Sequence, residues 1–400
     1  MSLQLIKIIV SLKRWGPFNL QMIYLDNNAT TALHPEVLKA MLPFLSAQQG
    51  NPASNHTFGR SAHTAIEEAR EKVAASVNAH PSQVIFTSSG TESNNTIING
   101  IAKAYPESHF GFSSIEHPCI SEPIKSLAHQ GFKVSEIPVD SNGIFNVSDV
   151  SDEMKQSLTF LSVMMANNET GVIQNIAEIA DWARDNKIQF HTDAVQALGK
   201  IKVDFEALDI DAMTISSHKI YGPQGIAALI INKKIDLFPY MQGGGQEKGL
   251  RSGTENIAAI IGFGKACERS SQNRVIFTEK IDLLRSVLEK NLVDLGAIIF
   301  CEKSHRLSNT TFFSFKNIDG STLLTALDRK GFAIASGSAC SSKSDEPSHV
   351  LLSMGVDLDL AQGALRVSLG VESNENEIND FIDTLKDEVS RLKQLTAVAA

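Results

Sequence analysis

The stretch Thr214-Ile-Ser-Ser-His-Lys-Ile-Tyr-Gly-Pro-Gln-Gly225 follows directly on Ala212 and Met213 and completes an apolar run of β-forming residues. Two serines, a histidine and a lysine end the run, and the Gly-Pro pair then turns the chain. A lysine that loses its proton near neutral pH can form a Schiff base with an aldehyde, and neighbouring hydroxyls and an imidazole can hold a phosphate. Taken alone, the stretch is equally compatible with a surface loop that carries a solvated lysine.

Alternating strand and helix patterns surround this stretch. Apolar strand candidates lie at residues 83–87, 109–113, 133–137, 158–165, 188–193, 212–215 and 226–231, with helical segments between several of them. Repeated β-α-β units of this kind predict an α/β fold with a parallel or mixed sheet between helices. Ligands bind beyond the carboxyl ends of the strands in such sheets. Most polar clusters of this chain fall at those strand ends.

The pattern changes after the three glycines at 243–245. We expect a helix over about 255–269, a long charged helix over 278–292, a β-rich segment, and helices at 320–330 and 375–395. A chain of 400 residues is also long for a single core, so a second, smaller domain is expected. The predicted division is a large domain at 37–264 and a small domain from 22–36 and 265–400. Residues 1–21 form an N-terminal arm or extension.

Composition argues against several functional classes. The net charge of −9 disfavours a nucleic-acid-binding protein, which needs a basic face. The apolar run at 5–10 is interrupted by Lys7 and is too short to span a bilayer, so no membrane association is expected. The few scattered cysteines lack metal-ligand spacing, which predicts free thiols, no metal site and a reducing, cytoplasmic location. They are Cys119, Cys267, Cys301 and Cys340.

A single cofactor, pyridoxal 5′-phosphate (PLP), fits the polar residues at the strand ends. PLP needs a lysine for its aldehyde, a carboxylate for its ring nitrogen and donors for its phosphate. Lys219 and Asp193 supply the first two groups, and His117 supplies a ring that can stack on the cofactor. Asp193 could instead cap a helix and His117 could bond to backbone, so the prediction depends on their joint occurrence. The other candidates are Thr91, Ser216 and His218 for the phosphate, with Asn168 and Gln196 as neutral hydrogen-bonding groups.

The turn at 88–95 carries small hydroxyl residues at a helix start, which suits a phosphate. It matches neither the dinucleotide-binding nor the Walker pattern, so NAD and ATP are not supported.

The chain resembles the cysteine desulfurases of the NifS/IscS type, in the class-V aminotransferase family of fold-type I PLP enzymes. The matching motifs run in the family's order from residue 24 to residue 370. They are YLDNNATT (24–31), GNPASNHTFGR (50–60), FTSSGTESNN (86–95), EH (116–117), ANNETGVIQ (166–174), HTDAVQ (191–196), SSHKIYGPQG (216–225), GGGQEKGLRSGT (243–254), SGSACSS (336–342), EPSHVL (346–351) and RVSLG (366–370).

The resemblance implies a large domain with a mostly parallel seven-stranded sheet between helices and a smaller α+β domain. It implies that Lys219 is the Schiff-base lysine, that Asp193 partners the ring nitrogen, and that His117 stacks on the ring and transfers protons. Asn168 and Gln196 would lie on the side of the ring's phenolic oxygen. The residues implied for the phosphate are Gly90, Thr91, Ser216 and His218, with Thr254 reaching the cofactor of the neighbouring subunit in a homodimer.

The resemblance also implies the reaction. Cys340 would take sulfur from PLP-bound L-cysteine as a persulfide, leaving L-alanine, while Arg366 and Asn168 hold the substrate. The small polar residues around Cys340 predict an exposed, mobile loop. The resemblance implies that this loop passes sulfur to an acceptor, such as an iron–sulfur scaffold protein or an enzyme of thio-cofactor synthesis. Arg366 could alternatively form a structural salt bridge.

Two alternatives remain open. The chain could be another PLP enzyme of the same fold, such as an aminotransferase, a selenocysteine lyase or an epimerase-like relative. It could also be a binding protein that has lost catalysis, although the intact set of Lys219, Asp193, His117 and Cys340 argues against this.

Overall fold

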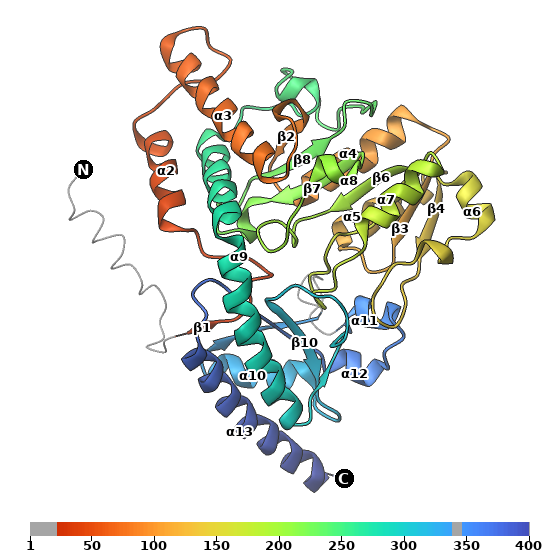
Figure 1. Cartoon of the computed structure of the whole chain (residues 1–400), viewed down its shortest axis with the longest axis vertical. Helices are drawn as coiled ribbons and strands as arrows, with labels where there is room; N and C mark the ends of the chain where they lie inside the picture. Colours follow the sequence, from red (N-terminus) through yellow and green to blue (C-terminus); the bar gives the residue numbers. More distant parts are fainter. Residues whose placement is uncertain (1–21, 338–345, 400) are drawn as a thin grey trace.

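The computed structural model describes residues 22–337 and 346–399, and the side chains up to residue 395. The predicted N-terminal arm and Cys340 lie outside the described residues. The chain forms a large sheet and a smaller sheet region, which one long helix connects (Figure 1). No helix in the described part of the chain combines the length and apolar character that a membrane crossing requires.

The large sheet has seven strands in the order β2-β8-β7-β6-β5-β3-β4. Only β8 runs antiparallel to its neighbours, so the sheet is mixed but mostly parallel, as the sequence predicts. The strands are β2 (Val84–Thr87), β3 (His109–Ser113), β4 (Lys133–Ile137), β5 (Phe160–Ser162), β6 (Gln189–Asp193), β7 (Ala212–Ser216) and β8 (Ala227–Ile231).

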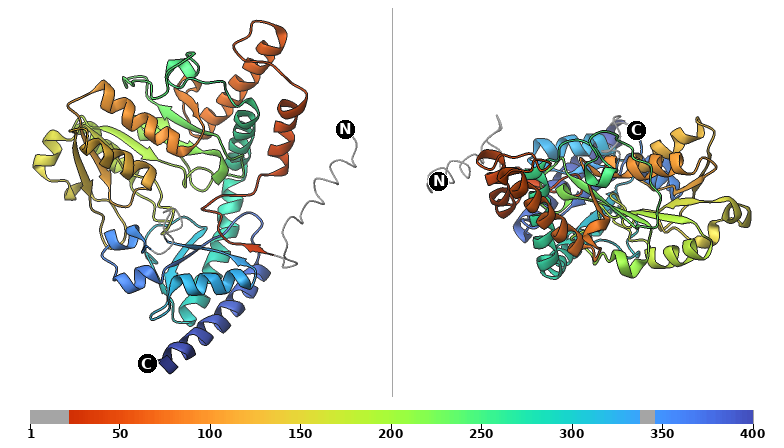
Figure 2. Two further views of the ribbon diagram at one scale, coloured as in Figure 1. Left: turned by 180° about the vertical axis from the view of Figure 1, so that it is seen from behind. Right: turned by 90° about the horizontal axis from the view of Figure 1, so that it is seen from above.

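Helices cover both faces of this sheet because its strands are apolar on both sides. In β2, Val84 and Phe86 pack into one hydrophobic cluster while Ile85 packs into another on the opposite face. The first cluster includes side chains of α3, α7 and the long helix α9 (Ile257–Asp294), and the second includes those of α4 and α5. Figure 2 shows the ribbon of these helices and of the sheet from two further sides. The helices on this part of the chain are α2 (Pro35–Ser46), α3 (Thr57–Ser76), α4 (Gly90–Ala104), α5 (Pro118–Ala128), α6 (Asp152–Ser157), α7 (Ile176–Asp185) and α8 (Phe205–Leu208).

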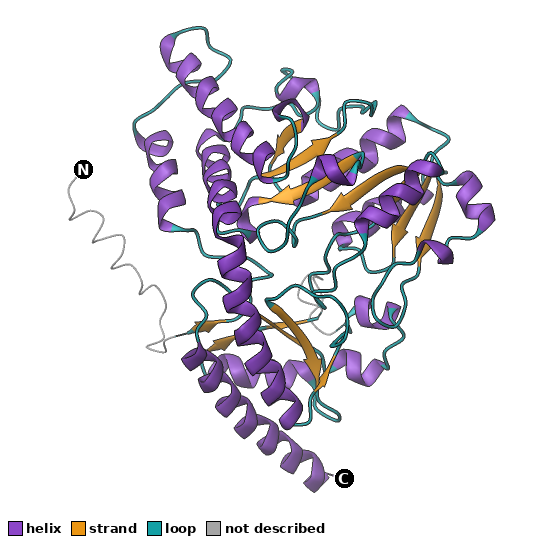
Figure 3. Cartoon of the chain, in the orientation of Figure 1, coloured by secondary structure: helices purple, strands orange, loops and turns teal. Residues whose placement is uncertain are grey.

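The small-sheet region contains a four-stranded antiparallel sheet in the order β12-β13-β10-β9 and the short parallel pair β1-β11. A separate hydrophobic cluster fills it, so this part has a core of its own. Figure 3 shows the helices and strands that build it. They are β1 (Ile23–Tyr24), β9 (Ile298–Ile299), β10 (Thr310–Ser314), α10 (Gly320–Arg329), β11 (Phe332–Ala333), β12 (Ala335–Ser336), α11 (His349–Ser353), α12 (Leu358–Gln362), β13 (Leu365–Ser368) and α13 (Glu375–Ala399).

The two helices expected over 255–269 and 278–292 are one continuous helix, α9 (Ile257–Asp294), so that prediction was wrong. Its first half buries Phe263 and Cys267 in the large-sheet core, and its second half buries Leu284 and Leu288 in the small-sheet core. Between them Ile276 is 70% exposed. The amphipathic pattern breaks where the helix passes from one core to the other, and the sequence there contains no Gly or Pro to end the helix. The predicted domain boundary at residue 265 stays a prediction.

Candidate active site

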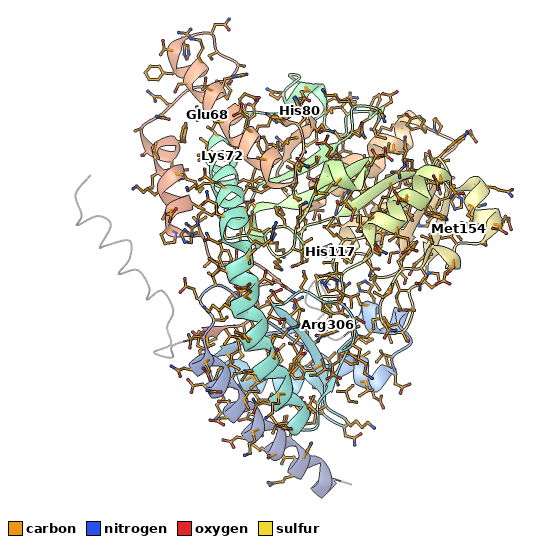
Figure 4. The ribbon with its side chains drawn as sticks, in the orientation of Figure 1. Glu68, Lys72, His80, His117, Met154 and Arg306 are labelled. Carbon is orange, nitrogen blue, oxygen red and sulfur yellow. The ribbon has the colours of Figure 1, made fainter. Side chains whose placement is uncertain are left out.

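Polar side chains gather at the carboxyl ends of the parallel strands, between the large sheet and the small-sheet region. Asp193 is the last residue of β6 and pairs in register with Thr214 of the neighbouring β7. Ser216 ends β7 and leads into the single turn η3 (Ser217–Lys219). Figure 4 places His117 in the same zone, between the two parts of the molecule.

Lys219 is held by the N-terminal segment that crosses between the two parts. Its Nζ donates to the carbonyl oxygens of Asn28 at 2.5 Å and Ala29 at 2.6 Å. The sharp turn after the lysine requires glycine, because a Cβ at Gly222 would lie 2.0 Å from Oγ of Ser217. Close packing against Ser217 therefore explains why the residue before Pro223 is a glycine.

The carboxylate of Asp193 is oriented by two donors. Asn94 Nδ2 donates to its Oδ2 at 2.8 Å, and the backbone N–H of Val195 donates to its Oδ1 at 2.9 Å. The side chain is buried at 6% exposure. Asp193 can therefore present a fixed acceptor to an N–H group of a ligand.

His117 caps the N-terminus of α5. Its Nδ1 accepts the backbone N–H of Cys119 at 3.1 Å, so the proton of the neutral imidazole sits on Nε2. Burial lowers the pKa of His117, Lys219 and His349 lower it further, and Asp193 opposes them. The ring is thus neutral at neutral pH, with one exchangeable N–H. The thiol of Cys119 lies 2.9 Å from the same Nδ1, and burial raises the pKa of that thiol, so it stays protonated.

The start of α4 can hold an anion. Ser89 caps the helix by accepting from the N–H of Glu92, while the N–H groups of Gly90 and Thr91 meet no acceptor in the described part of the chain. Such N–H groups and the positive end of the helix dipole favour a phosphate. A Cβ at Gly90 would lie 3.3 Å from the Val195 side chain, so this start is packed closely against the loop after β6.

His218 is a second candidate for holding the phosphate, as a neutral hydrogen-bond donor. Burial, with a smaller effect of Lys219, lowers its pKa to about 4. Its Nδ1 is 3.2 Å from the hydroxyl of Thr30. His218 can therefore hydrogen-bond a phosphate without adding charge. Ser216, 2% exposed, lies two residues before it at the end of β7.

Arg366 and Asn168 lie together on the side of the small sheet. Arg366, on β13, is 2% exposed and donates from Nη1 to the carbonyl oxygen of Asn168 at 2.9 Å and from Nη2 to Asp26 at 2.6 Å. The structural salt bridge left open by the sequence is thus present. The Nε of Arg366 is buried and has no hydrogen-bond partner among the described residues.

In the described part of the chain, Thr254 has no hydrogen bond to the site residues described above. It is exposed in the segment between Arg251, which bridges to Met241, and the start of α9. Among residues 22–337 and 346–399, no hydrogen bond is recorded between Thr254 and the other predicted site residues.

Sequence reasoning missed a polar centre built on Asn28. This residue, 1% exposed, accepts at its backbone oxygen from Lys219 and from Gln196 Nε2 at 2.9 Å. Its side-chain Oδ1 accepts from Lys200 Nζ at 3.0 Å and from Asn309 Nδ2 at 3.0 Å. The only hint in the sequence is that Lys200 follows Gln196 by four residues, which is the spacing of side chains on one face of a helical turn.

A second missed group lies beside His117. Glu116 and Glu169 are buried, and burial raises the pKa of both carboxyls. Ser348 donates to Glu169 at 2.5 Å, and His349 Nε2 lies 3.0 Å from the backbone oxygen of Glu116. The EPSHVL motif therefore docks on the two motifs that contain Glu116 and Glu169.

The arrangement suits a ligand with a carbonyl carbon, an N–H group and a phosphate. Lys219 supplies an amine, Asp193 an acceptor, the start of α4 an anion site and His117 a neutral acid–base group. No group of three or more His, Cys, Asp or Glu side chains in the described ranges could hold a metal ion.

Comparison with known proteins shows the family of the chain. A model of the family "Aminotransferase class-V" matches residues 23–381. The cysteine desulfurase IscS of Dictyoglomus turgidum is 41% identical over 380 residues, covering 94% of this chain and 96% of that protein. A cysteine desulfurase of Nostoc sp. is 40% identical over 382 residues, covering 94% and 95%.

The solved structures lead to the same family. The structure of a NifS-like protein from Rickettsia africae superposes with a TM-score of 0.85 at 35% identity, covering 92% of this chain and 99% of that one. The chain therefore belongs to the class-V aminotransferase family, whose members use pyridoxal 5′-phosphate, and within that family it is a cysteine desulfurase.

Proposed function

We propose that this cysteine desulfurase binds PLP at Lys219 and converts L-cysteine to L-alanine, and that Cys340 receives the sulfur as a persulfide. This proposal depends on one observation: Lys219, Asp193 and His117 lie with the N-terminus of α4 at one edge of the sheet. An aldehyde, a pyridine nitrogen and a phosphate are the three features of PLP, and each has a matching group here.

Two kinds of polar group support the fit to PLP: backbone N–H groups without an acceptor among the described residues, and side chains held in a fixed orientation. The N–H groups of Gly90 and Thr91 suit its phosphate, with the hydroxyl of Ser216 and neutral His218 as further donors. Asp193, oriented by Asn94 and Val195, suits a protonated ring nitrogen. When bound, the cofactor would supply an aldehyde to the lysine amine and an electron-accepting ring.

His117 is the proton carrier of the proposed site. Its Nδ1 is engaged by the N–H of Cys119, so only Nε2 can exchange a proton with a substrate. Its lowered pKa keeps the resting ring neutral, so its Nε2–H can donate a hydrogen bond to a substrate atom, and the ring can deliver that proton once Nδ1 has taken one up. With PLP bound, the amine of Lys219 would be the second group able to move protons.

Cys340 and Arg366 complete the proposal. The Cys340 thiolate attacks the sulfur of bound cysteine, and an S–S bond forms as the Cβ–S bond breaks. The electron pair of the broken bond is taken up at Cβ with a proton, which leaves alanine. Arg366, which already pairs with Asp26, would bind the substrate carboxylate through its guanidinium. Asn168 and Gln196 hydrogen-bond on the phenolic side of the cofactor.

We further propose a homodimer in which Thr254 contacts the cofactor phosphate of the partner subunit. Its exposure, apart from the other site residues, is consistent with a role across an interface. The sulfur acceptor would be a protein of iron–sulfur cluster or thio-cofactor synthesis in the cytoplasm.

The test is incubation of the PLP-loaded protein with L-cysteine and a reductant, with alanine and sulfide measured together. Equal amounts of both are expected. A normal PLP spectrum without alanine would refute the desulfurase reaction, and a protein that stays colourless with PLP would refute the cofactor.

Two variants separate the roles. Lys219→Ala should remove the visible absorbance of bound PLP, while Cys340→Ala should keep that absorbance and lose sulfide formation. Full activity of Cys340→Ala would refute the persulfide. Lys234→Ala, a substitution at an exposed lysine just after β8, is the control for loss of a lysine.

A further inference from the structure

Lys200 is a buried lysine next to the proposed cofactor site that has no assigned role. It is 6% exposed, and among the described residues no carboxylate lies within ion-pair distance of it. Its Nζ instead donates to two amide oxygens, Gln196 Oε1 at 2.7 Å and Asn28 Oδ1 at 3.0 Å. A buried lysine can only donate hydrogen bonds, so each amide that contacts it must turn its oxygen, and not its N–H₂ group, toward the lysine.

The contact determines the orientation of Gln196. The opposite end of that amide, Nε2, faces the carbonyl oxygen of Asn28 at 2.9 Å, which can only accept. The Lys219 Nζ donates to the same oxygen at 2.5 Å. Gln196 therefore has its Oε1 turned toward Lys200 and its N–H₂ turned toward the reactive lysine.

We propose that Lys200 is a positioning residue, which locks Gln196 with its N–H₂ group toward the cofactor and its carbonyl away from it. This inference rests on the proposed function, in which Gln196 lies on the phenolic side of PLP. An N–H donor stabilises an anionic phenolic oxygen, whereas a carbonyl oxygen in the same place would repel it. Without Lys200, only the carbonyl oxygen of Asn28 still opposes a reversal of the Gln196 amide.

The effect does not require a charged Lys200. A neutral amine has two N–H donors, which is the number of bonds that Lys200 makes here. Burial, with Lys219 and Arg366, lowers the pKa of Lys200 well below its usual value. The titratable and charged groups around it also include those lining a cavity of about 280 Å³ that Lys200 and Lys219 share: His34, Arg269, Arg274 and Glu372.

The experiment compares Lys200→Met, Gln196→Ala and the double variant as PLP-loaded full-length proteins. The readouts are the pH midpoint of the visible absorbance of bound PLP and the PLP dissociation constant, neither of which needs turnover. Lys200→Met should raise the pH midpoint and weaken PLP binding by about twofold to tenfold, the worth of one hydrogen bond. Because Lys200 acts through Gln196, the double variant should match Gln196→Ala.

Lys202→Met is the matched control, since Lys202 is two residues away and its side chain is 72% exposed. It should leave both readouts unchanged. Lys200→Arg keeps the N–H donors, and the adjoining cavity has room for the larger group, so it should restore the wild-type midpoint.

An unchanged midpoint in Lys200→Met, or additive shifts in the double variant, would overturn the proposal. Should Lys200→Met not fold, Lys200→Gln replaces it: its shorter side chain cannot reach both acceptors, so the midpoint should rise in Lys200→Gln and not in Lys200→Arg. Equal midpoints in these two variants would also overturn it. If the wild-type protein itself binds no PLP, the proposed function has failed, which is a distinct outcome.

Discussion

Asn94 and Asp193 are 99 positions apart in the chain, and a hydrogen bond of 2.8 Å joins them at the carboxyl edge of the large sheet. Asn94 lies on α4, whose first turn forms the anion site, and Asp193 ends β6. The helix that would hold the cofactor's phosphate thus also orients the carboxylate that would hold its ring nitrogen. The same amide nitrogen lies 3.0 Å from the sulfur of Cys119.

The first prediction concerns this pair. Asn94→Ala should weaken PLP binding by about twofold to tenfold, because Asp193 loses one of the two donors that orient it. Fluorescence titration of the apoprotein with PLP measures the change. Asn99→Ala removes an amide on the same helix that bonds only to the backbone oxygen of Asn95, and it should bind PLP normally. Equal affinities of the two variants would contradict the orienting role.

The second prediction concerns the pH dependence of turnover. Because the pKa of His117 lies below its usual 6.5, the imidazole gains its second proton only in more acidic solution. The part of the alanine-forming rate that depends on His117 should therefore stay constant from neutral pH down to pH 6.5 and should fall at lower pH. His117→Ala should reduce turnover by about 10²- to 10⁴-fold, the usual contribution of a general acid–base group.

A complete pH–rate profile of both proteins checks this prediction. A loss of wild-type activity centred above pH 6.5 and absent from the variant would show that His117 titrates higher than its buried position implies.

The third prediction concerns a buried ion pair beside strand β2 of the large sheet. Arg70 makes two bonds of 2.8 Å to Glu247, and its guanidinium lies 4.7 Å from the centre of the Phe86 ring. Glu247→Ala should lower the free energy of unfolding by about 3–5 kcal/mol, because the buried arginine keeps only the half-exposed Glu67 as a counter-charge and the Phe86 N–H loses its acceptor. Denaturant unfolding measures the loss.

An exposed pair offers the control. Arg184 also pairs with Asp181, but both side chains are largely exposed, so Asp181→Ala should cost at most about 1 kcal/mol. A loss below that value for Glu247→Ala would mean that water replaces the missing carboxylate.

The fourth prediction concerns acid stability. His191 is fully buried between the hydroxyls of Ser162 and Thr214, and burial lowers its pKa to about 3. The unfolded chain binds a proton at this histidine near pH 6.5, whereas the folded chain does not. The stability that His191 contributes is thus complete above pH 6.5 and is lost as the pH falls toward 3, by up to about 1.4 kcal/mol per pH unit.

His191→Gln, which can still bond to the hydroxyls, should remove that part of the slope. Unfolding free energies of both proteins between pH 7 and pH 4.5 give the comparison. Parallel curves would show that His191 is already protonated in the folded state.

The α/β class and the positions of Lys219, Asp193 and His117 could be predicted from sequence, because strand-end residues in a parallel sheet share one edge. The continuity of α9 could not, since the polar residues 268–274 interrupt its apolar stripe where the helix passes between two cores. Nor could the pairing of Arg366 with Asp26, which depends on β13 lying beside the segment after β1.

The sequence by itself determined the secondary-structure order and the chemical types available at the strand ends, because periodicity and residue type are local properties. Only the tertiary structure decided how those groups are oriented. Asn28 and Lys200 are 172 positions apart, yet their hydrogen bond lies at the centre of the network that holds Gln196 and Lys219. Hydrogen bonds are short and directional, so their partners are known only when distant segments have been brought together.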